Sequence, residues 1–190
     1  MTERRDRIPA VLDTSFWVLA YRAEIAANCL DLFDIIVPKA VAQEIMAGEA
    51  GVVAREYPYA TLFRHIQHEL RMSDVEVAPL GIFGPGEAEA IALAAQLGAV
   101  LLINERPGAQ YARNMGLDVA TVPAVIVLLR SQGVISDRAA RRKLGLIASN
   151  TAPSIVEDAF RALDALRTDD GRGRPRRCRR YRSPARKYRF

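Results

Sequence analysis

The stretch Ile8-Pro9-Ala10-Val11-Leu12-Asp13-Thr14-Ser15 decides the fold. Residues 8–12 form a short apolar run, which is typical of a buried strand, and a helical pattern follows from Thr14 to Tyr21. An aspartate at this junction suits the N-cap of the helix, and it also stands at the carboxyl end of the strand, where open parallel sheets bind their ligands. This stretch therefore predicts an α/β protein with an acidic group at its functional edge.

The same alternation of short apolar runs and helical patterns continues along the chain. Further strands are expected at residues 34–37, 100–103 and 119–122, with a possible edge strand at 75–77. Helices are expected at about 23–33, 38–48, 59–71, 87–97, 123–132, 137–147 and 154–166, and one more helix is expected to follow residues 104–108 and to end at 115. Strands that alternate with helices indicate a central, mostly parallel sheet covered on both faces.

Composition and charge divide the chain into a body and a tail. The 190 residues suit one domain, and no run of about 18 apolar residues predicts a membrane span. The N-terminus lacks the features of a signal peptide, and Cys29 and Cys178 are interpreted as free thiols, so a reducing, cytoplasmic location is expected. Residues 168–190 carry ten Arg or Lys against two Asp, and the remainder carries 17 against 20. We therefore expect one folded domain over 1–167, with a core at 9–132 and C-terminal helices at 136–167, followed by a disordered basic tail at 168–190.

Four acidic residues are expected to meet at one edge of the sheet. Asp13 and Glu105 follow predicted strands, whereas Glu44 and Glu87 lie on helices that begin at the same edge. Four carboxylates in one cleft would repel each other and raise their pKa values. A hard divalent cation relieves that repulsion, and ligation by oxygen alone favours Mg²⁺ or Mn²⁺.

Four segments together resemble the PIN-domain family. They are Val11-Leu12-Asp13-Thr14-Ser15, Val37-Pro38 with Val41, Glu44 and Ile45, Gly86 to Ala94 with Leu97-Gly98-Ala99, and Leu101-Leu102-Ile103-Asn104-Glu105. The resemblance spans roughly residues 9–132 and implies a three-layer α/β/α PIN-like fold. It also implies an acidic metal site and cleavage of single-stranded or structured RNA. Many relatives are VapC-like toxins, which usually dimerise and are silenced by an antitoxin.

The resemblance assigns roles to the acidic residues and their neighbours. Asp13 would be the central metal ligand, and Glu44, Glu87 and Glu105 would bind the ion directly or through water. Thr14 or Ser15 could support Asp13 or contact phosphate. Glu89 lies two positions after Glu87, about 200° around the helix, so both cannot face the site equally. Glu87 is therefore chosen, and Glu89 stays the second candidate.

Other interpretations stay open at this point. The family usually has Asp where this chain has Glu105, and several relatives have a further Asp at Asn104, which favours a weakened PIN fold that only binds nucleic acid or protein. A flavodoxin-like receiver or nucleotide binder is a third option, and His65 with His68 could begin a zinc site. The tail either binds RNA phosphates or is dispensable. Its arginines proposed for binding are Arg176, Arg177, Arg179 and Arg180.

Overall fold

The computed structural model describes residues 7–47, 57–73 and 81–170. Its strands are β1 (Ile8–Leu12), β2 (Phe33–Pro38), β3 (Arg71–Ser73), β4 (Val100–Leu102) and β5 (Val119–Ala120). Its α-helices are α1 (Thr14–Arg22), α2 (Cys29–Leu32), α3 (Lys39–Ala47), α4 (Pro58–Ile66), α5 (Pro85–Leu97), α6 (Arg106–Asn114), α7 (Val122–Ser131), α8 (Asp137–Ile147) and α9 (Pro153–Asp170). Two short 3₁₀ helices are η2 (Gln67–Glu69) and η3 (Ala148–Asn150).

The described strands form one parallel sheet in the order β3-β2-β1-β4-β5. Strand β1 is central, pairing with β2 through Ala10 opposite Ile35 and with β4 through Ala10 opposite Val100. This order contradicts the flavodoxin-like option, in which the first strand lies between the second and third strands. The expected parallel sheet is confirmed.

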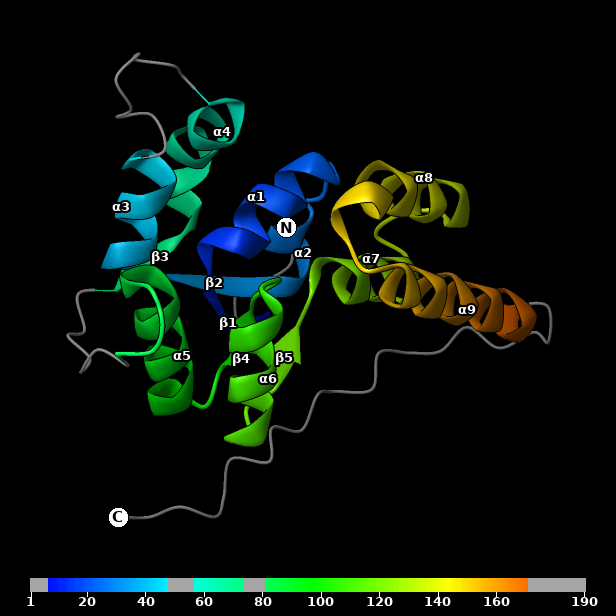
Figure 1. The fold of residues 1–190 in the computed structure, drawn as a ribbon. Coiled ribbons are helices and arrows are strands. Elements are labelled where there is room, and N and C mark those ends of the chain that lie inside the picture. The colour runs from blue at the N-terminus through cyan, green and yellow to red at the C-terminus, as the bar shows by residue number, and fades with distance from the viewer. Residues whose placement is uncertain (1–6, 48–56, 74–80, 171–190) are drawn as a thin grey trace.

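Helices cover both faces of the sheet, as Figure 1 shows. Helix α5 packs on β1, β2 and β4 with α6 beside it, whereas α1 and α4 lie over the opposite face. Aromatic side chains pack between α1 and α4. Trp17 is buried and contacts the ring of Phe63 edge to face, and its indole N–H donates to Tyr59 O at 2.9 Å. The three-layer α/β/α arrangement expected from the sequence is therefore confirmed.

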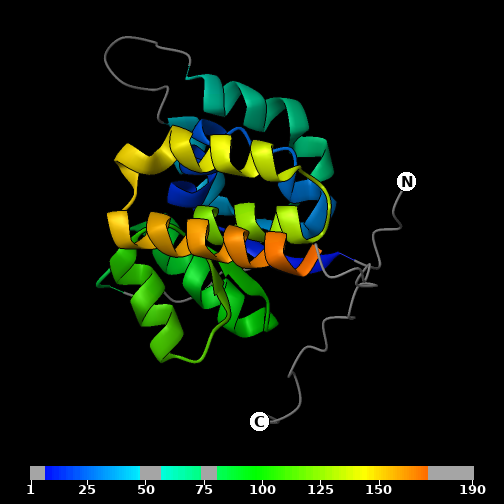
Figure 2. The same cartoon turned by 90° about the vertical axis from the view of Figure 1, so that its right-hand side faces the viewer.

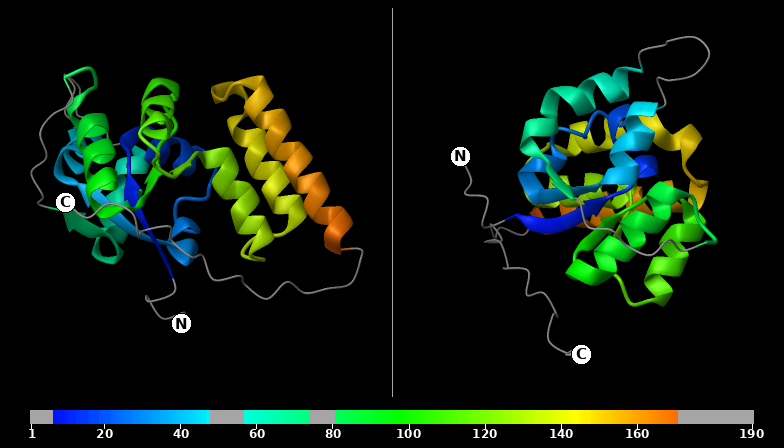
Figure 3. Two further views of the ribbon diagram at one scale, coloured as in Figure 1. Left: turned by 90° about the horizontal axis from the view of Figure 1, so that it is seen from below. Right: turned by 90° about the vertical axis from the view of Figure 1, so that its left-hand side faces the viewer.

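The C-terminal helices form a group of their own beside the sheet. Helices α7, α8 and α9 pack against one another, and α1 contacts both α7 and α8. The left panel of Figure 3 shows the three helices side by side, and in Figure 2 α8 and α9 lie toward the viewer. Their apolar faces are buried at Leu129, Leu144 and Leu163, so these helices extend the hydrophobic core beyond the sheet.

Several predicted boundaries were wrong. The helix expected at 23–33 is reduced to α2, because Glu24 adopts a left-handed backbone with φ of 56° and breaks the helix after α1. The helix expected at 59–71 ends at Ile66. Arg71, which was expected to end this helix, begins strand β3 instead. The strand expected at 75–77 lies outside the described residues.

Local signals explain where the correctly predicted helices begin and end. Pro58, Pro85, Pro107 and Pro123 lie in the first turns of α4, α5, α6 and α7, where a missing N–H costs nothing. Gly98 ends α5 in a left-handed conformation with φ of 59°, which glycine adopts without a steric penalty. In the part of the chain that the structure describes, no helix is both long and apolar enough to cross a membrane.

Candidate active site

Asp13 lies at the junction of β1 and α1, at the carboxyl edge of the sheet. Its side chain is only 3% exposed, and its backbone N–H donates to Leu102 O at 2.9 Å, which ties the end of β1 to β4. The carboxylate caps α1 by accepting the Ser15 N–H at 2.8 Å. Burial raises the pKa of Asp13, the Ser15 hydrogen bonds partly offset that rise, and the nearby charge of Glu44 adds to it.

Ser15 connects Asp13 to the loop after β4. The Ser15 hydroxyl donates to Oδ2 of Asp13 and accepts the backbone N–H groups of Asn104 at 3.1 Å and Glu105 at 3.2 Å. One hydroxyl therefore fixes the buried carboxylate against the segment that carries Glu105. This is the supporting position proposed for Ser15, and Asn104 contributes to it through its backbone.

Glu44 lies on α3 and bridges α1 and α5. Its Oε2 accepts the Thr14 hydroxyl at 2.7 Å, and its Oε1 accepts the backbone N–H of Gly86 at 2.8 Å. A Cβ built at Gly86 would overlap this carboxylate, standing 2.5 Å from Cδ and 2.6 Å from Oε1 of Glu44. The absence of a side chain at residue 86 is therefore what lets Glu44 reach the start of α5.

Within this group of acidic residues, Glu87 has an unsatisfied side-chain oxygen. Its Oε1 is buried and has no hydrogen-bond partner among the described residues. Burial raises the pKa of Glu87, and the charges of Asp13, Glu105 and Glu44 raise it further, in that order. The Gly108 amide lies close enough to lower the pKa in part, although it makes no hydrogen bond of acceptable geometry to Oε1. An unpaired buried carboxylate oxygen is costly unless a cation meets it.

Glu105 and Glu89 occupy different positions from Glu87. Glu105 is exposed at the N-cap of α6, and its side chain caps no backbone N–H. Glu89 accepts the backbone N–H of Ala40 at 2.6 Å, so it caps the first turn of α3. The structure thus brings Asp13, Glu44, Glu87 and Glu105 to one edge and assigns Glu89 to helix capping.

The chemistry of this acidic cluster fits a hard divalent cation. Its donors are carboxylate oxygens, the preferred ligands of Mg²⁺ and Mn²⁺, and the unpaired Glu87 oxygen identifies where a positive charge is missing. Among the residues that the structure describes, no three His, Cys, Asp or Glu side chains stand close enough to share one ion. The exposed Glu105 side chain is the member of the cluster with the greatest freedom to turn.

The sequence analysis assigned no role to two glycines of this site. Gly86 gives room to Glu44, and a Cβ built at Gly108 would overlap Oε1 of Glu87 and stand 2.8 Å from Cδ1 of Ile103. Both glycines are buried within the first turns of helices, where glycine is unfavourable relative to alanine. That local conflict between residue type and secondary structure was the available signal.

The other predicted sites are the histidine pair and the tail arginines. His65 and His68 are exposed, and the Nδ1 atom of His68 contacts His65 O at 3.1 Å. No third ligand for a zinc ion joins them in the described ranges, so a zinc site is not supported. The tail arginines Arg176, Arg177, Arg179 and Arg180 lie outside the described residues.

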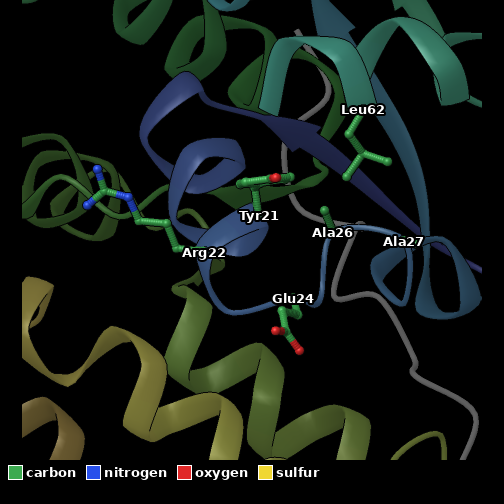
Figure 4. A pocket seen from close by; sticks show the side chains of 6 residues that line it. All are labelled: Tyr21, Arg22, Glu24, Ala26, Ala27 and Leu62. Atoms are coloured by element: carbon green, nitrogen blue, oxygen red, sulfur yellow. The ribbon is translucent and has the colours of Figure 1, made fainter. Parts of the chain in front are cut away.

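One cavity lies at the end of α1 opposite to the acidic cluster. Figure 4 shows it at the C-terminal end of α1, with Tyr21, Ala26 and Leu62 around a volume of about 400 Å³. Tyr21 is eight residues after Asp13 along this helix, which corresponds to roughly 12 Å at 1.5 Å per residue. Its acidic residue, Glu24, is bound to Arg142 at 2.5 Å, so this cavity offers no comparable acidic site.

The chain is similar to known proteins at two levels, solved structures and a family model. Among solved structures, the chain is similar to a PilT N-terminus domain protein, SSO1118, from Sulfolobus solfataricus P2, with 17% identity and a TM-score of 0.43 over 60% of this chain and 87% of that chain. It is also similar to a domain of a functionally unknown protein from Methanocaldococcus jannaschii DSM 2661, with 18% identity and a TM-score of 0.44 over 60% and 90%. No curated protein matches the chain. The PIN-domain family model DUF3368 matches residues 10–150, most of the chain, and the protein therefore belongs to the PIN-domain family.

Proposed function

We propose that this protein is a metal-dependent endoribonuclease that uses Mg²⁺ or Mn²⁺ at the acidic edge of its sheet. PIN domains are generally nucleases, and family membership supplies the reaction class. The single observation that carries the proposal is the buried, unpaired Oε1 of Glu87 beside the charges of Asp13 and Glu105. Such an arrangement is stabilised by a cation, and phosphodiester hydrolysis is chemistry that a cation at this position would assist.

Asp13, Glu87 and Glu105 are the residues that would hold the ion. When bound, the metal supplies charge neutralisation at the scissile phosphate and activation of a water molecule. Asp13 is the most rigid of the three because β1, β4 and Ser15 fix it. Glu87 is oriented by the first turn of α5, and the exposed side chain of Glu105 completes the set from the loop after β4. Thr14 and Ser15 hold neighbouring carboxylates by hydrogen bonds.

The test is cleavage of a mixed single-stranded RNA pool, together with one structured RNA. Purified protein is assayed with Mn²⁺, with EDTA, and as the Asp13→Asn variant, and Mn²⁺ binding is measured separately by calorimetry. We expect metal-dependent cleavage that the variant loses. If the folded protein binds Mn²⁺ but cleaves none of the RNAs, the metal site is supported and the nuclease function is refuted.

The second candidate is a PIN-fold module that binds nucleic acid or protein without cleaving it. The exposed position of Glu105 favours it, and so does the finding that no three acidic side chains among the described residues stand close enough to share one ion. This candidate predicts RNA binding that is equal with Mn²⁺ and with EDTA. It also predicts that Glu105→Asp, which restores the more usual acid, creates cleavage that the natural chain lacks.

The biological setting rests on the resemblance to toxin members of the family. We propose that the protein acts in the cytoplasm as a homodimeric toxin with a cognate antitoxin. Induced expression should then arrest growth, and the Asp13→Asn variant should not. Light scattering of the purified chain should give twice the monomer mass. Growth that continues during expression of active nuclease would separate the enzyme from the toxin role.

A further inference from the structure

Glu44 differs from the other acids because protein donors already engage both of its oxygens. Thr14 donates to Oε2 at 2.7 Å and the Gly86 N–H donates to Oε1 at 2.8 Å. These donors come from the first turns of α1 and α5, so Glu44 joins three helices at one point. By contrast, Oε1 of Glu87 is buried with no hydrogen bond within the described residues.

The backbone around Glu44 is adapted to the carboxylate itself. Gly86 is buried in the first turn of α5, and any Cβ there would occupy the space of the Glu44 carboxylate. Gly84, two residues earlier, has no atom within 4 Å of a built Cβ, so the close approach is specific to residue 86. Gly86 directly precedes Glu87, and a contact that fixes the Gly86 amide also fixes the start of the Glu87 side chain.

We propose that Glu44 is a positioning residue that sets the start of α5 through Thr14 and Gly86, and is not a ligand of the metal. The proposal rests on the nuclease function proposed above and divides its four acids into three that meet the cation and one that orients them. Because Glu44 acts as a hydrogen-bond acceptor, an amide of the same shape can replace it. A glutamine would accept the Gly86 N–H through its oxygen and donate to the Thr14 oxygen through its nitrogen.

The experiment compares Glu44→Gln, Glu44→Ala and Gly86→Ala with two matched controls. Gln43→Ala changes an exposed neighbour on α3, and Gly84→Ala adds a methyl group where there is room. Each variant is assayed for kcat and KM of RNA cleavage, for Mn²⁺ affinity by calorimetry, and for the backbone amide resonance of residue 86. Thermal unfolding verifies that each variant is folded.

We expect Glu44→Gln to keep Mn²⁺ affinity within about threefold and at least a third of kcat. Glu44→Ala and Gly86→Ala should lower kcat by about 10- to 100-fold, the range for residues that orient metal ligands. Adding Glu44→Ala to Gly86→Ala should cost less than a further twofold, because both changes remove the same contact. The controls should match the natural chain.

Loss of Mn²⁺ affinity in Glu44→Gln as severe as in Asp13→Asn would overturn the proposal and make Glu44 a ligand. Additive losses in the double variant would also overturn it. If the natural chain cleaves no RNA, the Gly86 resonance still decides. A resonance that shifts in Glu44→Ala but not in Glu44→Gln supports the positioning role and leaves the nuclease function as the failed part, whereas no shift in either variant refutes the positioning role.

Discussion

Asp13 caps a helix and is also buried, and burial of its negative charge is unfavourable in the absence of a cation. It caps α1 and is 3% exposed, yet burial and Glu44 raise its pKa above the ordinary value of 3.8. A carboxyl group with a raised pKa binds its proton more tightly in the folded chain than in the unfolded chain. Its contribution to stability is therefore present at low pH and is lost as pH rises through the folded pKa. The raised pKa of Glu87 has the same sign.

Replacement of Asp13 by Asn should stabilise the metal-free protein while it abolishes cleavage. Asn caps helices as well as Asp and carries no charge to bury. In EDTA at pH 8 we expect the variant to have a Tm about 2–4 °C higher, the shift that roughly 1 kcal/mol produces in a chain of this size. Cleavage with Mn²⁺ should fall by at least about 100-fold, in line with the loss of metal-site residues.

The pH dependence provides the control for this variant. The Tm gain should shrink at pH 5, where the carboxyl group of the natural chain is closer to protonated. Glu157→Gln changes an exposed acid on α9 and should show no such dependence. A Tm gain of equal size at both pH values would mean that the charge of Asp13 is not the source of the instability.

At the residue scale, the sequence was sufficient to find the acids but not to rank them. Asp13 and Glu105 follow from strand ends, because the carboxyl ends of parallel strands meet at one edge. The choice between Glu87 and Glu89 depended on a contact with Ala40, 49 residues earlier, which no local pattern contains. The positions of Gly86 and Gly108 required atomic coordinates as well, because their partners are far apart in the sequence.

Helix α6 supports the site by approaching Glu87 closely at Gly108. Gly108→Ala would place a methyl group on the Glu87 carboxylate, and the carboxylate must then move. We expect Mn²⁺ affinity to fall by about 10- to 100-fold. The Tm should stay within about 3 °C, because the displaced group is the end of a flexible side chain and alanine favours the helix.

Gly145→Ala is the matched control for Gly108→Ala. Gly145 also lies in a helix, α8, but nothing stands within 4 Å of a Cβ built there. It should leave Mn²⁺ affinity unchanged and raise the Tm slightly through helix propensity. Equal Mn²⁺ affinities in the two variants would show that Gly108 has no role in orienting Glu87.

Helix α8 is attached to the turn after α1 through a buried lysine. Lys143 Nζ donates to Glu24 O at 2.5 Å, and Glu24 is the residue with the left-handed backbone. Burial lowers the pKa of Lys143, so its charge is held there at a cost. Lys143→Ala should reduce the free energy of unfolding by about 1–3 kcal/mol, because the part-buried carbonyl of Glu24 loses its donor.

Arg142→Ala is the neighbouring control for the Lys143 prediction. Arg142 is exposed and binds Glu24 at 2.5 Å, and exposed ion pairs contribute about 0–1 kcal/mol. Denaturant unfolding of both variants measures the difference, and RNA cleavage should persist in each because neither residue is near Asp13. A larger loss for Arg142→Ala than for Lys143→Ala would contradict the buried contact as the main attachment.

At the scale of elements, the strands were more predictable than the helix ends. Short apolar runs were sufficient for β1, β2 and β4, because a parallel sheet buries both faces of its central strands. The edge strand β5 is half-buried and shorter than the run at 119–122 predicted. The apolar spacing through residues 23–33 predicted a helix, and Ile25 and Cys29 are indeed buried, but in a turn and in α2. Burial at helical spacing does not require helical backbone when a residue such as Glu24 breaks it.

At the scale of the whole molecule, the excess of basic residues and the proposed metal ligands lie in different parts of the chain. The net charge of +5 arises from residues 168–190, whereas the remaining residues have more acidic than basic groups. The family match covers residues 10–150 and contains Asp13, Glu44, Glu87 and Glu105. Under the proposed function, an acidic body would act on a polyanion, and a cation at the site would reduce the repulsion between them.

A chain ending at Asp170 should therefore retain its fold and its chemistry. We expect a Tm within about 2 °C of the full chain and cleavage within about twofold at about 0.15 M salt, since every proposed ligand and its support precede this residue. Affinity for a non-cleavable RNA, measured against salt concentration, decides the role of residues 171–190. A tail that neutralises several phosphates would steepen the slope of log Kobs against log salt by about 0.7 for each contact with single-stranded RNA. Equal slopes would make the tail dispensable, and loss of cleavage in the shortened chain would move part of the active site into it.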